Sequence, residues 1–108
     1  IRPPSGQAQT HVSEAYESMR EVIQNLRTRA IAMRKDNPTP AQAEIAKQAL
    51  QQSEHTEKHD LAAIWEMMLM PQNYSESDAK KLLQDSSGNF ANLLNLEKEM
   101  AALMKLRK

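Results

Sequence analysis

Two histidines four residues apart, His55 and His59, are the residues of this sequence best suited to metal chemistry. Side chains at positions i and i+4 of a helix share one face, so the two imidazoles could bind a single metal ion. Glu54 or Glu66 could add a carboxylate ligand. A zinc site needs three or four ligands, however, and a histidine pair on a polar helix face is often simply exposed to solvent. The sequence favours two exposed histidines and leaves metal binding as an alternative.

Three arginines spaced seven residues apart each follow an apolar residue on one predicted helix. In one interpretation they keep the helix soluble, and their aliphatic stems lie along the apolar strip. In the other, strip and arginines form a groove with an apolar floor and a cationic rim, suited to partly unfolded or acidic protein segments. The client or partner would then bind at Met19, Arg20, Ile23, Leu26, Arg27, Met33 and Arg34.

Patterns typical of enzymes and of several other protein classes are missing from the 108 residues. Two glycines, neither beside a predicted strand, do not support a phosphate-binding loop, a dinucleotide fingerprint or a nucleophile elbow. The absence of cysteine excludes disulfides and thiolate sites. A net charge of zero argues against nucleic-acid binding, and no apolar run approaches the ~18 residues of a membrane span. We therefore expect a protein without catalysis, cofactor or membrane span.

Helical periodicity runs through most of the chain. From Ser13, apolar residues recur at steps of three and four until Asp36-Asn37-Pro38 stops the first helix. Thr39-Pro40-Ala41-Gln42 is a capping box that opens a second helix, with no breaker before Pro71. Ser75 is the predicted cap of the last helix, and no segment shows the two-residue period of a strand.

The sequence thus predicts an all-α fold, with three or four helices in an open antiparallel arrangement like a long curved hairpin. Residues 1–10 are expected to be a flexible leader and residues 11–108 a single helical domain. Residues 51–60 are wholly polar and either bridge solvent or carry a site; they are compatible with helix or loop. Met67-Met68-Leu69-Met70 cannot all face one core, so some must be exposed or meet a partner. Four aromatic residues make a small core, so we expect a homodimer.

A family resemblance rests on two stretches. Met67-Met68-Leu69-Met70, a turn containing Asn73-Tyr74, and a Ser75-Glu76 cap lead into the long last helix. Earlier, Val12 opens a helix that continues with Ser18-Met19-Arg20-Glu21-Val22-Ile23-Gln24. These stretches resemble the Spy/CpxP family of periplasmic envelope-stress proteins. The resemblance implies a curved helical dimer that cradles unfolded proteins or binds a sensor kinase, and related members bind metals through histidines.

The leading hypothesis is a periplasmic, dimeric, helical chaperone or stress-sensor accessory whose partner is an unfolded client or a sensor protein. Two alternatives stay open. One is a metal-sensing or metal-binding helical protein that uses His55 and His59. The other is a structural or secretion-system adaptor that binds one dedicated partner helix.

Overall fold

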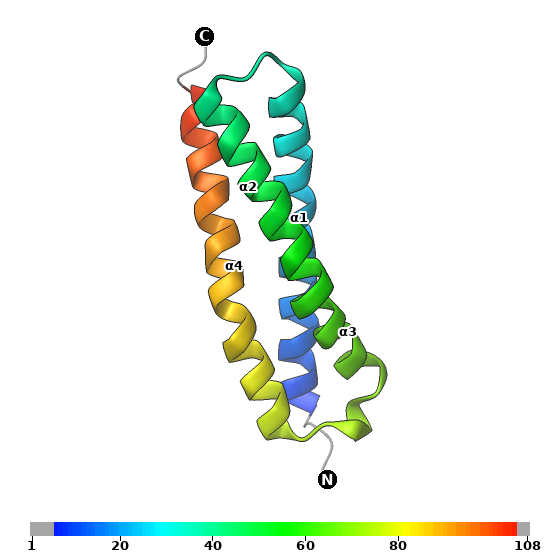
Figure 1. The fold of residues 1–108 in the computed structure, drawn as a ribbon. Coiled ribbons are helices and arrows are strands. Elements are labelled where there is room, and N and C mark those ends of the chain that lie inside the picture. The colour runs from blue at the N-terminus through cyan, green and yellow to red at the C-terminus, as the bar shows by residue number, and fades with distance from the viewer. Residues whose placement is uncertain (1–5, 106–108) are drawn as a thin grey trace.

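The computed structural model describes residues 6–105, which form an extended helical bundle of 55 × 18 × 16 Å (Figure 1). The first long helix runs up the bundle, a second long segment returns, and the last helix runs up again beside both. The first and last helices are therefore parallel to each other and antiparallel to the segment between them. The elements in order are α1 (Gly6–Lys35), α2 (Pro40–Thr56), η1 (Glu57–Leu61), α3 (Ala62–Leu69), η2 (Pro71–Asn73) and α4 (Glu76–Lys105).

The predicted all-α fold is confirmed, and the described residues contain no strand. None of their helices combines the length and the apolar character that crossing a membrane requires. The predicted start of the first helix at Ser13 is wrong, because α1 begins at Gly6. Val12 is only 2% exposed, and its burial in the core holds the first turns of α1 against the bundle. Residues 6–10 of the predicted leader are therefore helical, and residues 1–5 lie outside the described part.

The predicted capping box of α2 and the predicted Ser75 cap of α4 are both present, and the Ser75 cap also forms a capping box, with Asp78. The Gln42 amide N–H donates to Thr39 Oγ1 at 3.1 Å, and the Thr39 N–H donates to Gln42 Oε1 at 2.9 Å. At the start of α4, the Asp78 N–H donates to Ser75 Oγ at 3.1 Å, and the Ser75 N–H donates to Asp78 Oδ2 at 2.9 Å. These bonds satisfy amide groups that a helix start leaves without partners. Hydrogen bonds from the Ser75 backbone and side chain lower the pKa of Asp78.

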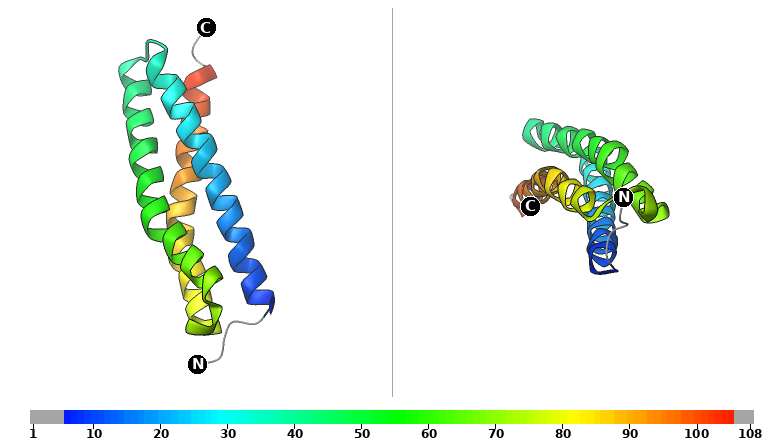
Figure 2. Two further views of the ribbon diagram at one scale, coloured as in Figure 1. Left: turned by 90° about the vertical axis from the view of Figure 1, so that its right-hand side faces the viewer. Right: turned by 90° about the horizontal axis from the view of Figure 1, so that it is seen from below.

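The three long segments pack against one another along the bundle (Figure 2), and all three contribute apolar side chains to the core. On α1 it includes the whole predicted apolar strip: Met19, Ile23, Leu26 and Met33 are between 0% and 4% exposed. Near the middle of the bundle the core also holds three small polar residues, Ser53, Thr56 and Ser86, each at most 2% exposed. The core of this single chain is thus continuous along the bundle and is interrupted by one polar layer.

The wholly polar stretch 51–60 is helical. Its first six residues belong to α2 and its last four to the π-helical turn η1. The last buried residue of α2 is Thr56, and the next buried residue is Leu61, five positions later. Regular α-helical spacing would instead bring His59 or Asp60 to the core. A π turn accommodates one extra residue, so Leu61 takes the core position and both polar side chains stay out of it. The segment from Pro40 to Leu69 therefore remains one helical rod.

Candidate protein-binding groove

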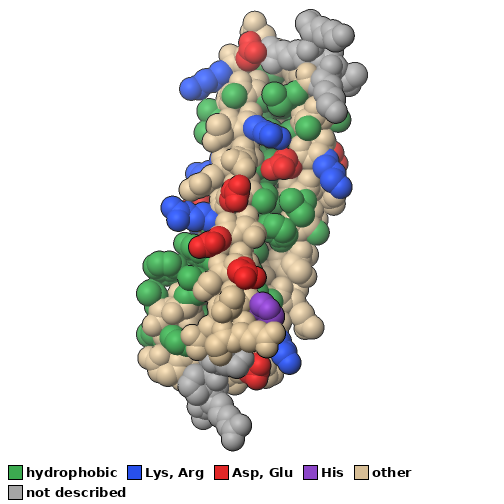
Figure 3. All heavy atoms as spheres, turned by 180° about the vertical axis from the view of Figure 1, so that it is seen from behind, with side chains coloured by type: hydrophobic (Ala, Val, Ile, Leu, Met, Phe, Trp, Pro, Cys, Tyr) green, Lys and Arg blue, Asp and Glu red, His purple; other side chains and the backbone are tan. Residues whose placement is uncertain are grey.

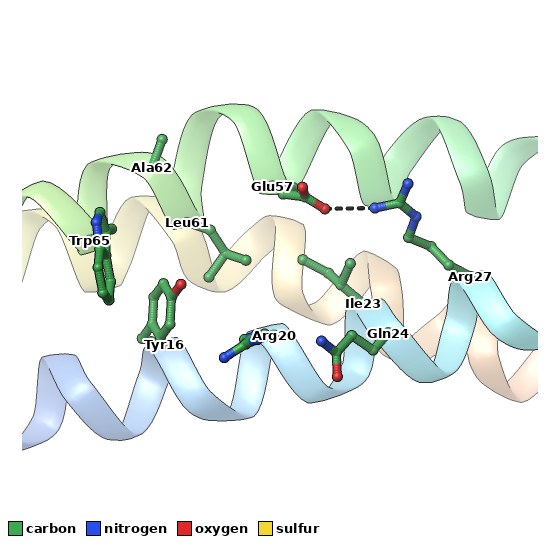
Figure 4. A pocket seen from close by; sticks show the side chains of 9 residues that line it. All are labelled: Tyr16, Arg20, Ile23, Gln24, Arg27, Glu57, Leu61, Ala62 and Trp65. Atoms are coloured by element: carbon green, nitrogen blue, oxygen red, sulfur yellow. Dashed lines mark hydrogen bonds and ion pairs between the residues drawn. The ribbon is translucent and has the colours of Figure 1, made fainter.

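A groove of about 460 Å³ lies between α1 and the η1–α3 part of the second segment (Figure 4). Its lining combines two aromatic side chains, two arginines, one carboxylate and a short apolar floor. We call it the aromatic groove. Its lining residues are Tyr16, Arg20, Ile23, Gln24, Arg27, Glu57, Leu61, Ala62 and Trp65.

One end of the aromatic groove is built by Tyr16 from α1 and Trp65 from α3, which face each other in Figure 4. Their ring centroids are 5.4 Å apart, and the ring planes are tilted by 35°. This is a favourable range for aromatic pairs. Trp65 remains 46% exposed, although it is the largest apolar side chain of the sequence. The pair therefore offers aromatic surface that a further group could cover.

The other end carries the charges. Arg27 Nη1 lies 2.8 Å from Glu57 Oε2, and both side chains are about half exposed. Solvent and salt weaken such a pair, so it contributes little to the stability of the fold. Arg20, between this pair and the aromatic end, is exposed and has no hydrogen bond or ion pair with any described residue. Its guanidinium is the free cationic group of the groove.

The structure brings together three of the seven predicted binding residues: Arg20, Ile23 and Arg27 line the aromatic groove. The predicted apolar floor is wrong for Met19, Leu26 and Met33, which are buried in the core. Packing of α2 and α4 onto α1 covers these side chains, so a client cannot reach them in this conformation. Arg34 is exposed and lies outside the groove.

Sequence reasoning missed the aromatic pair, although each member carried a signal. Trp65 is the only tryptophan of the chain, and Tyr16 is the only aromatic residue on the α1 stripe. Nothing in the sequence indicates that they meet, because 48 intervening residues and a π turn set their register.

The apolar surface continues from the groove along α3. Trp65, Leu69 and Met70 are 46%, 60% and 37% exposed, whereas Met67 is 3% exposed. The prediction that the run from Met67 to Met70 is divided between core and surface is therefore confirmed. Figure 3, seen from the side opposite to Figure 1, shows hydrophobic side chains gathered over this end of the bundle at the lower left. Such a patch is a common mark of an interaction surface.

His55 and His59 lie on one exposed face, with their ring centroids 4.5 Å apart and their planes tilted by 43°. They are the residues that could hold a metal ion. No third histidine, cysteine or carboxylate joins them among the described residues. Glu54, one proposed ligand, accepts a hydrogen bond from Lys58 Nζ at 2.7 Å, which lowers the pKa of Glu54.

Comparison with family models, curated proteins and solved structures gives no match for this chain.

Proposed function

We propose that this chain is a non-catalytic protein-binding module whose aromatic groove binds a protein segment carrying an apolar and an acidic side chain. The observation that carries the proposal is the half-exposed Trp65 packed against Tyr16 beside the unpaired guanidinium of Arg20. Tryptophan, tyrosine and arginine are the residue types that most often dominate binding energy at protein interfaces.

Each part of the groove has a role in this proposal. An apolar side chain of the partner covers the exposed ring of Trp65 and removes apolar surface from water. A neighbouring carboxylate of the partner pairs with Arg20, which fixes the register of the segment and increases the association rate. The exposed Leu69 extends the apolar contact along α3, so longer apolar segments gain more than short ones.

In the wider role that we propose, the partner is a partly unfolded client or a sensor protein in the periplasm, and the chain acts as a chaperone or stress-sensor accessory. The resemblance to the Spy/CpxP family and the apolar surface of α3 support this role. An adaptor for one dedicated helix would use the same groove. The two roles differ in selectivity, since a chaperone accepts many apolar segments and an adaptor accepts one.

Fluorescence of the single tryptophan, Trp65, tests the groove directly, because a ligand that covers its ring changes its emission. The probes are two tryptophan-free peptides with the same leucines, one with aspartates and the other with lysines between them. We expect tighter binding of the acidic peptide. Arg20→Ser should weaken that binding about tenfold, and Arg34→Ser, the matched control outside the groove, should leave it unchanged. Equal affinity for both peptides, or equal effects of both variants, would contradict the proposal.

A heat-aggregating test protein then separates the two roles. A chaperone should delay the aggregation of several unrelated test proteins, and the Trp65→Ala variant should lose most of this effect. Peptide binding without any protection from aggregation would favour the adaptor.

We also propose that two copies associate through the face formed by α1 and α4. Apolar side chains that include Leu83 and Phe90 line a groove there, Leu94 is 37% exposed, and Figure 3 shows hydrophobic side chains between these helices. The charges of α1 support an antiparallel pairing of two copies because, apart from Arg20 and Arg27 of the aromatic groove, its acidic residues all precede its basic ones. The charged residues concerned are Glu14, Glu17 and Glu21, then Arg29, Arg34 and Lys35.

Light scattering tests this association. At high micromolar concentration the mass should be twice the 12.3 kDa of one chain. Leu94→Glu, which places a charge in the apolar face, should restore the mass of one chain, and Lys47→Glu on α2 should not. A parent protein that stays monomeric would refute the association.

A further inference from the structure

A second groove, of about 610 Å³, lies between α2 and α4 and has a different chemistry. Five of the eight side chains that line it are carboxamides, and we call it the amide groove. None of the eight is Phe, Tyr or Trp. The lining residues are Gln48, Gln51, Gln52, His55, Asn92, Asn95, Leu96 and Glu99.

Two interhelical hydrogen bonds fix how the amides stand across this groove. Gln42 Nε2 donates to the Leu103 carbonyl, and Gln52 Nε2 donates to Asn89 Oδ1, each at 3.3 Å. Since α2 and α4 are antiparallel, the positions between these two bonds pair in order. Gln48 stands across from Asn95, and Gln51 across from Asn92, which gives two amide pairs about 4.5 Å apart along the bundle.

One end of the groove is held by internal hydrogen bonds. Gln52 also donates to Thr56 Oγ1 at 3.3 Å, and Asn89 Nδ2 donates to Asp60 Oδ2 at 2.7 Å. Asp60 belongs to the π turn, so η1 anchors the middle of α4 to the second segment. The network positions the two helices without using the amides further along the groove.

The remaining amides have hydrogen-bonding capacity to spare. Gln51, Asn92 and Asn95 are exposed and form no hydrogen bond with any described residue. Each carboxamide carries two N–H donors and an acceptor oxygen and has no charge. A complementary ligand must therefore present donors and acceptors along both of its edges, and the carboxylate of Glu99 in the lining disfavours an anion.

An extended polypeptide main chain has this property, because each residue other than proline offers one N–H donor and one carbonyl acceptor. In an extended chain these groups point sideways, and the side chains alternate above and below them. The amides of α2 would then meet one edge of such a chain, and those of α4 the other. No Phe, Tyr or Trp lines the groove, which disfavours sugars and bases because these usually stack on a large aromatic ring; the aromatic side chain of the lining is His55.

We propose that the amide groove binds an extended stretch of main chain without regard to its side-chain sequence. This site goes beyond the aromatic groove and does not depend on it. If both grooves bind one client, the second contact becomes intramolecular and strengthens the whole complex.

Side-chain amide resonances of Asn92 and Asn95 test the proposal by NMR on the full chain. One probe is a blocked decapeptide of alternating serine and alanine. The other alternates serine and proline, which stays extended but lacks every second N–H. We expect the alanine peptide to shift both resonances with a Kd on the order of 1 mM, and the proline peptide to bind about tenfold more weakly. Equal binding of both peptides, or no shift at about 10 mM, would overturn the proposal.

Variants separate this site from the aromatic groove. In the Gln51→Leu variant, the alanine peptide should no longer shift the side-chain amide resonance of Asn95. Leucine keeps the helix but cannot form hydrogen bonds with the peptide. Gln84→Leu, an exposed amide of α4 outside the groove, is the matched control and should leave the shift unchanged. Arg20→Ser should also leave it unchanged, so failure of the aromatic groove and failure of the amide groove are distinguishable. Loss of the shift in the Gln84→Leu variant would likewise overturn the proposal.

Discussion

The aromatic groove and the amide groove lie on two sides of the same helical segment and differ in almost every physical property. The first exposes a tryptophan and a free guanidinium, so it offers apolar area and charge. The second offers neutral amides that both donate and accept hydrogen bonds. In the two proposals, one three-helix bundle presents two recognition surfaces, because the grooves lie between different pairs of neighbouring helices.

The π turn connects these two surfaces. Glu57 and Leu61 of η1 line the aromatic groove, whereas Asp60 binds Asn89 beside the amide groove. A regular α-helix turns by about 100° per residue, so without the π turn the extra residue would rotate the helix that follows and direct Trp65 away from Tyr16 on α1. The π turn thus lines one groove with Glu57 and Leu61 and borders the other with Asp60.

The largest effect should come from the core that supports both grooves. Leu26 is fully buried, so Leu26→Ala should lower the free energy of unfolding by about 2–5 kcal/mol. Leu94→Ala, at a site 37% exposed, should cost much less. Urea unfolding followed by circular dichroism measures both. A Leu26→Ala variant with unchanged stability and weakened client binding would show that Leu26 is a surface residue that contacts the client. It would contradict the assignment of Leu26 to the core.

Salt should affect the two grooves differently. Raising the salt from about 0.1 M to about 1 M shortens the Debye length from about 10 Å to about 3 Å, which screens the pair between Arg20 and a partner carboxylate. Binding of the acidic peptide should weaken about tenfold, whereas the shifts of Asn92 and Asn95 with the alanine peptide should stay within a factor of two. Equal salt dependence would remove the proposed difference between charged and neutral recognition.

Lowering the pH should weaken the N-terminal cap of α4 before that of α2. Of these two caps, only that of α4 contains a titratable group, the carboxyl of Asp78. The pKa of Asp78 is lowered in the folded state by its hydrogen bonds with Ser75. Its stabilisation is therefore present above the unfolded value of about 3.9 and is lost as the pH falls through the folded value. Asp78→Asn should lower Tm at pH 6 and have no effect near pH 2.

The matched control for the acid experiment is the uncharged cap of α2. Thr39→Ala should cost about 1 kcal/mol at either pH, because neither Thr39 nor Gln42 ionises in this range. Differential scanning calorimetry at the two pH values measures both variants. The same loss for Asp78→Asn at pH 2 as at pH 6 would show that its charge has no role in the cap.

Zinc should have the smallest effect. His55 and His59 supply two ligands and no third joins them among the described residues, so we expect only a small rise in Tm with Zn²⁺. A large rise that disappears in the His55→Ala/His59→Ala variant would favour the metal-binding alternative. It would also place a charge beside the amide groove, since His55 is part of its lining.

The sequence predicted those parts of the fold that depend on local patterns. The capping box of α2, the Ser75 cap of α4 and the apolar stripe of α1 were recognisable, because each depends on residues within a few positions of one another. The start of α1 at Gly6 was not, since it depends on the burial of Val12 by other helices. An apolar stripe edged by arginines also looks the same whether it lies in a core or in a groove.

The candidate site was harder to predict, because its members come from different helices. Arg20 and Arg27 were found from their spacing on one helix. Their neighbours Trp65 and Leu61 reach them only through the α1–α2 turn and the π turn, whose combined geometry no local pattern gives. The amide groove was missed for the same reason, since its glutamines and asparagines look like ordinary surface residues when each helix is read alone.

In evolutionary terms, the π turn is the structure expected when one codon is inserted into the gene for a regular α-helix and the helix keeps its core contacts. Removing one of residues 57–60 would bring Leu61 to the fourth position after Thr56, a regular α-helical step, with Ile64 and Met67 still facing the core. The second segment can therefore change its length by one codon at this place and retain its packing. A one-codon change in the middle of α1 would instead turn either Met19 or Met33 away from the core, so the gene should tolerate length variation at η1 and not there.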